Sequence, residues 1–79
     1  MAVHIELSPF LRQYAPGYNP EEGLLIENGS GKTIGALIRE LGIPTEKVNS
    51  IMVNYRPSDP TYVAKDGDRI GLVMSIGGG

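Results

Sequence analysis

Apolar and polar residues alternate in several short stretches of the chain, and this alternation is typical of strands with one buried face. The clearest stretch begins at Val3 and is followed by Pro9, which ends the pattern. Near the C-terminus, Asp66-Gly67-Asp68 is a strong turn signal ahead of the last apolar stretch. The predicted strands are Val3–Leu7, Leu24–Glu27, Ser50–Asn54 and Arg69–Ile76.

One segment has the period of a helix instead. Its apolar side chains recur at positions i, i+3, i+4 and i+7, which places them along one stripe of an amphipathic helix. Thr33 is suited to the N-cap, and Gly42 followed by Pro44 favours a left-handed stop. The sequence therefore predicts a helix over Thr33–Leu41, with its stripe formed by Ile34, Leu37, Ile38 and Leu41.

Two segments read as connections. Pro16–Gly23 is rich in proline, glycine and glutamate, which favours a loop, and we expect Phe10, Leu11 and Tyr14 to fold back under it. Tyr55–Ala64 contains two prolines and is predicted to be a crossing loop. Within it, Tyr62 and Val63 are expected to pack inward and extend the core.

The order β, β, α, β, loop, β predicts an α+β fold of the β-grasp (ubiquitin-like) kind. A mixed sheet of four to five strands would pack on one main helix, because the helix must bury its apolar stripe. The last strand would pair in parallel with the first. We expect residues 1–76 to form the domain and residues 77–79 to form a C-terminal glycine tail.

Composition narrows the possible partners. The chain of 79 residues has 7 basic and 9 acidic residues, a formal net charge of −2, which gives no basic stripe for nucleic acid. It has no cysteine, so a disulfide and a thiolate metal site are both excluded. No stretch approaches the roughly 20 apolar residues of a membrane span. Without a signal-peptide pattern at the start, the expected compartment is the cytoplasm.

The last three residues of the sequence are glycines, Gly77, Gly78 and Gly79. Ordering glycines costs the most backbone entropy and buries no side chain, so we expect this tail to extend from the domain by on the order of 10 Å. Its tip would offer the α-carboxylate of Gly79, which has a reference pKa of about 3.3–3.7 and is ionised at neutral pH. Glycine would let the walls of a narrow channel in another protein approach the backbone. The alternative is a frayed end without a function.

The assembled residues resemble the MoaD and ThiS family of ubiquitin-like sulfur carriers over nearly the whole chain. The most specific combination is the Asp-Gly-Asp turn about ten residues before a terminal diglycine. One departure is Gly77, because the family usually has a different small residue before its two glycines. The segments that carry the resemblance are 10–15, Thr33-Ile34, Leu41-Gly42, Val53-Asn54, 65–70 and the glycine end.

The resemblance implies a carrier protein that is not itself an enzyme and binds no cofactor of its own. An adenylyltransferase similar to MoeB or ThiF would use ATP and magnesium to convert the Gly79 carboxylate into an acyl-adenylate, with Gly78 beside it. A persulfide sulfur donor would then leave a thiocarboxylate. A sulfur-accepting synthase subunit would then use that sulfur to make a cofactor. The expected product is molybdopterin, and the thiamine thiazole is the second choice. The free carrier would be a monomer.

A docking surface for such a partner is also predicted. Met52 and Val73 face away from the buried positions of their strands, and the resemblance implies that partners use this face of the sheet. Arg56 and Arg69 would surround the patch with charge, and Gly77 would lie in the partner's channel. Two other functions remain open. One is a protein modifier joined to lysines through Gly79, and the other is a β-grasp interaction module whose tail is incidental.

Other candidate signals have simpler explanations. The segment 29–33 contains Gly-Ser-Gly-Lys-Thr, but Ile26 stands where a phosphate-binding loop needs glycine, so we interpret it as a polar loop with a helix cap. His4 has no catalytic motif beside it and is expected to be a solvated surface residue. Asp66 and Asp68 are expected to hydrogen-bond the backbone of their own turn, and Asp59 is too distant in the chain to join a cation site with them.

Overall fold

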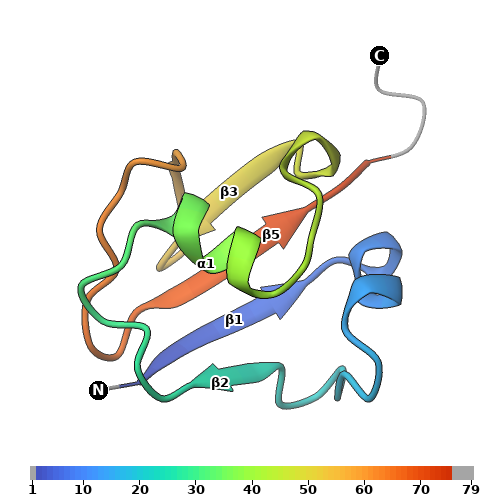
Figure 1. Cartoon of the computed structure of the whole chain (residues 1–79), viewed down its shortest axis with the longest axis horizontal. Helices are drawn as coiled ribbons and strands as arrows, with labels where there is room; N and C mark the ends of the chain where they lie inside the picture. Colours follow the sequence, from blue (N-terminus) through green and yellow to red (C-terminus); the bar gives the residue numbers. More distant parts are fainter. Residues whose placement is uncertain (1, 76–79) are drawn as a thin grey trace.

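A computed structural model describes residues 2–75 of the chain. It consists of one mixed sheet with a single α-helix across one face (Figure 1). The predicted boundary after residue 76 and the predicted tail of residues 77–79 lie outside the described residues. The elements are β1 (Val3–Leu7), the 3-10 helix η1 (Pro9–Tyr14), β2 (Leu24–Ile26), α1 (Ile34–Glu40), the 3-10 helix η2 (Thr45–Lys47), β3 (Ser50–Val53), β4 (Arg56–Ser58) and β5 (Arg69–Val73).

The five strands follow the order β2-β1-β5-β3-β4. β1 and β5 pair in parallel at the centre, while the other neighbours are antiparallel. Ile5 lies opposite Leu24 on one side and Ile70 on the other, so residues of one face are in register across the sheet. The predicted parallel return of the last strand beside the first is confirmed, and with it the β-grasp arrangement.

The residues that were predicted to begin and end the helix, Thr33 and Gly42, have these roles in the structure. The Thr33 side-chain oxygen Oγ1 accepts a hydrogen bond of 3.1 Å from the Ala36 N–H, and so caps the first turn. Gly42 has a φ of 77°, the left-handed conformation that ends helices at low cost in glycine. The buried residues of the core are Val3, Ile5, Leu7, Leu11, Ile34, Leu37, Ile38, Ile43, Ile51, Val53, Ala64, Ile70 and Leu72.

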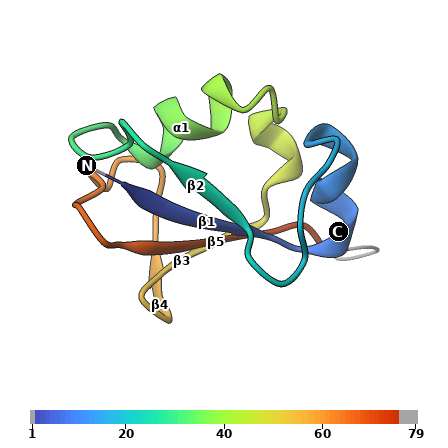
Figure 2. The ribbon, with the colours of Figure 1, turned by 90° about the horizontal axis from the view of Figure 1, so that it is seen from below.

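Figure 2 shows the sheet nearly edge-on, with α1 on one side of it. The β3–β4 hairpin and the loop before β2 extend toward the other side. Burying the helix stripe against one face leaves the opposite face without a covering helix among residues 2–75. We call this opposite face the open face. It carries Ser50, His4, Glu6, Met52, Arg69, Gly71 and Val73, which alternate with the buried positions of β1, β3 and β5.

The prediction of a loop over Tyr55–Ala64 was wrong at its start, because β4 pairs there with β3. Asn54 and Tyr55 connect the two strands with φ values of 51° and 68°, as in the two-residue turns that match the twist of a hairpin. Pro57 lies in β4, but this strand is at the edge of the sheet. A missing N–H is tolerated at an edge, so the proline was a poor guide to a loop.

The last strand is shorter than predicted, ending at Val73 rather than Ile76. The reason is that the next two backbone N–H groups donate to side chains instead of to a neighbouring strand. Met74 N donates to Ser8 Oγ at 2.9 Å, and Ser75 N donates to Asn49 Oδ1 at 2.7 Å. Two side-chain acceptors therefore replace the strand ladder where the chain leaves the sheet.

Two side chains that were expected in the core are exposed over nearly half of their surface. Phe10 is 44% exposed, because η1 has three residues per turn and directs Leu11 and Tyr14 to the core instead. Val63 is 49% exposed, since it bridges to Thr33 and its neighbours Tyr62 and Ala64 turn inward. The inward packing predicted for Leu11, Tyr14 and Tyr62 is confirmed.

Candidate functional site

The open face has one row of residues that crosses four strands. Glu6 of β1 lies opposite Gly71 of β5, Gly71 lies opposite Met52 of β3, and Met52 lies opposite Pro57 of β4. Directly opposed residues on one face have neighbouring side chains. Gly71 has none, so the middle of this row is bare backbone between Glu6 and Met52.

The structure brings most of the predicted docking residues together. Met52 and Val73 are both half-buried and lie on the open face, as does Arg69. The guanidinium of Arg69 forms an ion pair of 3.2 Å with Glu6 Oε2, and both side chains are about half exposed. Arg56 is not on this face, because it lies opposite Val53, whose side chain is buried on the helix side.

A small cavity of about 150 Å³ opens beside this ion pair. Its lining includes Tyr55 from the hairpin turn, which is 79% exposed. A φ of 68° is costly for a bulky aromatic residue, since residues other than glycine and asparagine rarely adopt it. Despite this cost, the turn carries a large aromatic side chain, which is exposed to solvent next to Met52. The residues around this cavity are Glu6, Met52, Tyr55, Arg69 and Gly71.

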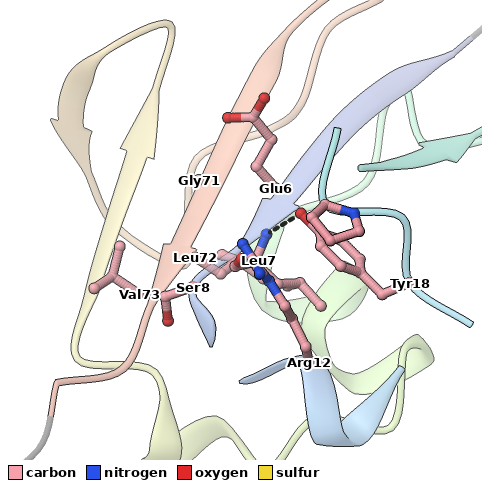
Figure 3. Close-up of a pocket in the computed structure, with 9 residues that line it drawn as sticks. Glu6, Leu7, Ser8, Arg12, Tyr18, Gly71, Leu72 and Val73 are labelled. Carbon is pink, nitrogen blue, oxygen red and sulfur yellow. Dashed lines mark hydrogen bonds between the residues drawn. The ribbon is translucent and has the colours of Figure 1, made fainter. Parts of the chain in front are cut away.

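A larger cavity of about 320 Å³ lies on the same face, where β1 and β5 end (Figure 3). Arg12 of η1 borders it, and its Nε donates to Leu7 O at 3.0 Å. The guanidinium carbon of Arg12 lies 5.1 Å from the centre of the Tyr18 ring, within the range of a cation–π contact. The Tyr18 hydroxyl in turn accepts a bond of 2.9 Å from Leu7 N. These contacts fix the guanidinium in place at the cavity.

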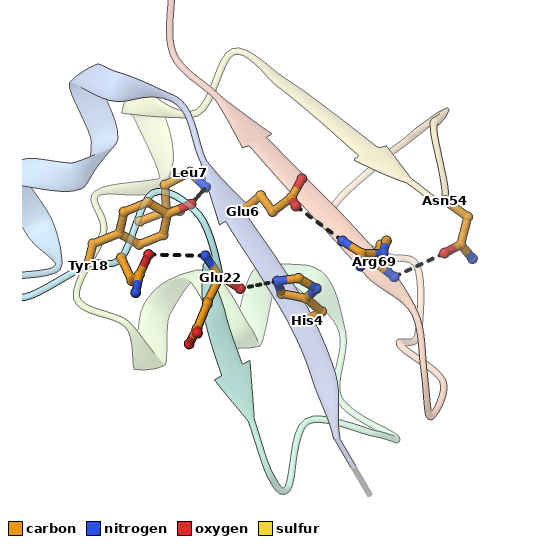
Figure 4. A network of polar contacts seen from close by, with 8 residues as sticks. His4, Glu6, Leu7, Tyr18, Glu22, Asn54 and Arg69 are labelled. Atoms are coloured by element: carbon orange, nitrogen blue, oxygen red, sulfur yellow. Dashed lines mark hydrogen bonds and ion pairs between the residues drawn. The ribbon is translucent and has the colours of Figure 1, made fainter.

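The Asp-Gly-Asp turn holds the start of β5. The carboxylate of Asp68, which is only 7% exposed, accepts hydrogen bonds of 2.9 Å from Asn54 Nδ2, the Tyr62 hydroxyl and Lys65 N. Asn54 Oδ1 accepts from Arg69 N at 3.0 Å (Figure 4). The predicted hydrogen bonding of this turn to its own backbone is confirmed at Lys65. Among the described residues, no cluster of acidic or histidine side chains is arranged to hold a metal ion.

These contacts shift two pKa values. Burial acts to raise the pKa of the Asp68 carboxyl, but the hydrogen bonds from Lys65 N–H, Asn54 and Tyr62 outweigh it and hold that pKa below its ordinary value. The pKa of the Tyr62 hydroxyl is raised, chiefly because it donates to the Asp68 carboxylate. The network thus joins the hairpin turn, the loop before β5 and the first residue of β5 around one ionised group.

The remaining sequence candidates have structural roles. Lys32 Nζ forms an ion pair of 2.8 Å with Glu40 Oε1, and Thr33 caps α1, as expected for a polar loop before a helix. His4 is half-buried rather than fully solvated, because its Nε2 hydrogen-bonds with the Glu22 carbonyl oxygen (Figure 4). This contact ties the loop before β2 to the open face.

The predicted activation residues Gly78 and Gly79, and Gly77 before them, lie outside the described residues. The described chain leads toward them from the end of β5, where Ser8 and Asn49 hold Met74 and Ser75. Val73 lines the larger cavity. The open face and the exit of the chain are therefore adjacent.

Sequence reasoning missed several residues of the two cavities, among them Glu6, Arg12, Tyr18, Tyr55 and Gly71. Two of these have a signal in the sequence, because strand alternation places Glu6 on the open face and a glycine inside a strand pattern, such as Gly71, suggests a bulge or a close backbone approach. Arg12, Tyr18 and Tyr55 have no such signal, because their role depends on which loops the fold brings to the open face.

Comparison with known proteins places the chain in a family. The family model described as Mut7-C ubiquitin matches residues 1–73. The chain belongs to the Mut7-C ubiquitin family. No curated protein matches its sequence. Among solved structures, the crystal structure of SAMP1 from Haloferax volcanii is similar with a TM-score of 0.67 and 15% identity, over 100% of both chains.

Membership in the Mut7-C ubiquitin family confirms the ubiquitin-like assignment, and the similarity to SAMP1 confirms the fold. At this low identity the structural similarity shows the fold alone. The finer resemblance to MoaD and ThiS stays a prediction. In the part of the chain that the structure describes, no helix has the length and apolar character needed to span a membrane.

Proposed function

We propose that this member of the Mut7-C ubiquitin family is a carrier protein that is activated at the Gly79 carboxylate by a partner enzyme. The observation that carries the proposal is the combination of a ubiquitin-like fold with a run of glycines that begins four residues after the last residue of its central strand. The chain acts as a co-substrate rather than as an enzyme, and ATP and magnesium are used by the partner.

The proposed chemistry has two stages. In the adenylyltransferase, which is similar to MoeB or ThiF, a Gly79 carboxylate oxygen attacks the α-phosphorus of ATP and pyrophosphate leaves. The outer sulfur of a persulfide donor then attacks the acyl carbon and displaces AMP, and a thiol cleaves the resulting acyl disulfide to leave a thiocarboxylate. Adenylation is needed because a carboxylate oxygen is a poor leaving group until it is esterified to phosphate.

The open face supports docking of the partners. Met52 and Val73 provide apolar contact area beside the charged pair of Glu6 and Arg69, and an apolar centre with a polar rim is typical of transient protein interfaces. Because Val73 is close to the exit of the chain, a partner bound here is positioned to receive Gly79. The sulfur-accepting synthase subunit, for molybdopterin or the thiamine thiazole, would use the same face in turn.

Two alternatives share parts of this account. A protein modifier would undergo the same adenylation, after which a lysine amine of a target protein would attack the acyl carbon. An interaction module would need no adenylation, and it is favoured by the family description, which names Mut7-C together with ubiquitin. A partner containing a Mut7-C domain would then bind the β-grasp domain directly.

Intact-mass spectrometry separates these functions. The full chain is incubated with a MoeB- or ThiF-like adenylyltransferase from the same organism, ATP, magnesium and a persulfide donor, and a gain of about 16 Da corresponds to exchange of one oxygen for sulfur. A chain lacking Gly79 is the control and should gain nothing. High-mass conjugates in cell extract would support the modifier instead. If the mass of the chain does not change with ATP, and cells fully tolerate the deletion of Gly79, only the interaction module remains as a function.

A further inference from the structure

Gly71 has no role in folding that the structure reveals. Its φ lies outside the left-handed region, and a Cβ built on it would meet only Met52 Cβ, at an ordinary contact distance of 3.8 Å. Gly23 differs, because it has a φ of 73° and a Cβ there would come within 2.8 Å of the Ile5 carbonyl oxygen. A glycine inside a strand weakens it, since it has no side chain to pack and loses more entropy on folding.

Gly71 instead lies between the two cavities of the open face, which share it as a lining residue. Both cavities, of about 320 and 150 Å³, have Glu6 and Gly71 in their linings. We call the combined depression the Gly71 groove. It runs from Arg12 and Tyr18 at one end to Met52 and Tyr55 at the other. Glycine in a strand often marks a site where another backbone approaches closely, and here the bare backbone of β5 permits that approach.

The charged residues around the Gly71 groove indicate which chemical group of a partner binds there. Of its two arginines, Arg69 is neutralised by Glu6, whereas Arg12 has no ion pair with any carboxylate of residues 2–75. Arg12 is also held rigid by its bond to Leu7 O and by stacking on Tyr18. A guanidinium fixed in this way loses little side-chain entropy when it binds, and its remaining N–H donors match the geometry of a carboxylate.

We infer that the Gly71 groove binds an extended segment of a partner protein, whose carboxylate side chain pairs with Arg12 and whose apolar side chain packs on Met52 and Tyr55. The inference rests on the proposed function only in taking the occupant to be a protein. The strands β1, β5 and β3 span about 10 Å, and Arg12 lies beyond the end of β1, so at least two to three extended residues are needed to cross the groove. Because alternate residues of an extended segment share a face, the segment presents its acidic and apolar residues two or four positions apart.

A random dodecapeptide library displayed on phage tests this inference on the full chain. Enriched peptides are synthesised, their dissociation constants are measured by fluorescence polarisation, and their binding site is mapped by amide chemical shifts. We expect enriched peptides to contain an acidic and an apolar residue at this spacing and to shift the amides of Arg69 and Gly71. Affinity should fall as salt is raised, because the contact with Arg12 is ionic.

Variants distinguish the groove from other surfaces. Gly71→Val should weaken binding by about tenfold or more, with Gly71→Ala intermediate, because the added side chain projects into the groove. Arg12→Gln should weaken binding about tenfold and remove most of the salt dependence. Leu25→Ala is the matched control, since Leu25 is an exposed apolar residue of the edge strand β2 that lines neither cavity, and it should leave affinity unchanged.

Four results of the binding experiments would overturn the inference. They are a failure to enrich any peptide, enriched peptides without an acidic residue, shifts confined to another surface, and concentration-dependent self-association through the open face, which would make a second copy the occupant. A Gly71→Val chain that melts well below the native chain would also refute it, since the glycine would then serve folding. Peptide binding at the groove without any ATP-dependent mass change would remove the proposed function and leave this inference standing.

Discussion

The Asp68 carboxylate is predicted to make a large polar contribution to stability, because it is buried and accepts three hydrogen bonds. Replacing it by alanine removes the acceptor for Asn54 Nδ2, the Tyr62 hydroxyl and Lys65 N. A hydrogen bond to a charged group contributes about 1.5–3 kcal/mol, and the three bonds are not additive because the donors can turn partly to water. We therefore expect Asp68→Ala to lower the free energy of unfolding by about 2–3 kcal/mol.

This loss corresponds to a melting temperature about 10–20 °C lower for a domain of this size. Urea denaturation and thermal melts followed by far-UV circular dichroism measure both quantities. Asp66→Ala is the matched control, because Asp66 is an exposed carboxylate in the same turn and should change stability by less than about 0.5 kcal/mol. Equal effects at the two positions, or a loss below about 0.5 kcal/mol at Asp68, would refute the reasoning.

The same group gives the stability a pH dependence of known sign. Because the pKa of Asp68 is lower in the folded chain than its ordinary value, its contribution is present above about pH 4 and is lost as the pH falls through the folded-state pKa. Asp68→Asn keeps the shape but cannot titrate. The difference in unfolding free energy between the native chain and this variant should shrink below about pH 4, and a constant difference would contradict the assignment.

Two further predictions concern elements that flank the cavities. Leu11→Ala should cost about 2–5 kcal/mol in urea denaturation because Leu11 is fully buried, whereas Phe10→Ala beside it should cost less than about 1 kcal/mol; comparable losses would mean that η1 does not orient these residues as described. Tyr55→Gly should raise stability by about 0.5–1 kcal/mol, because glycine accepts a positive φ and Asn-Gly suits this hairpin turn; a destabilised variant would show that the Tyr55 ring contributes to packing.

The helix and the central strands could be predicted because local patterns decide them. Thr33 and Gly42 act through hydrogen bonds and backbone angles within a few residues, so the sequence contains the whole explanation. The β3–β4 hairpin could not be predicted by the same means. Its turn residues are Asn54 and Tyr55 rather than Asn-Gly, and Pro57 masks a strand whose edge position is a property of the sheet.

The residues of the candidate site also differ in whether the sequence alone could predict them. The positions of Met52 and Val73 on the open face follow from strand alternation alone. The Gly71 groove does not, because Arg12 reaches it from η1 and Tyr18 from a loop, and only the parallel pairing of β1 with β5 brings these segments beside Gly71. The ion pair of Glu6 and Arg69 likewise joins residues near opposite ends of the chain.

Exchange of labelled pyrophosphate into ATP tests the central claim most directly, because it detects reversible adenylation of a carboxylate without any sulfur donor. With a MoeB- or ThiF-like adenylyltransferase from the same organism, the full chain should stimulate exchange strongly, and a chain lacking Gly79 should not. Equal exchange with both chains, or none with either while the enzyme binds the full chain, would contradict activation at Gly79.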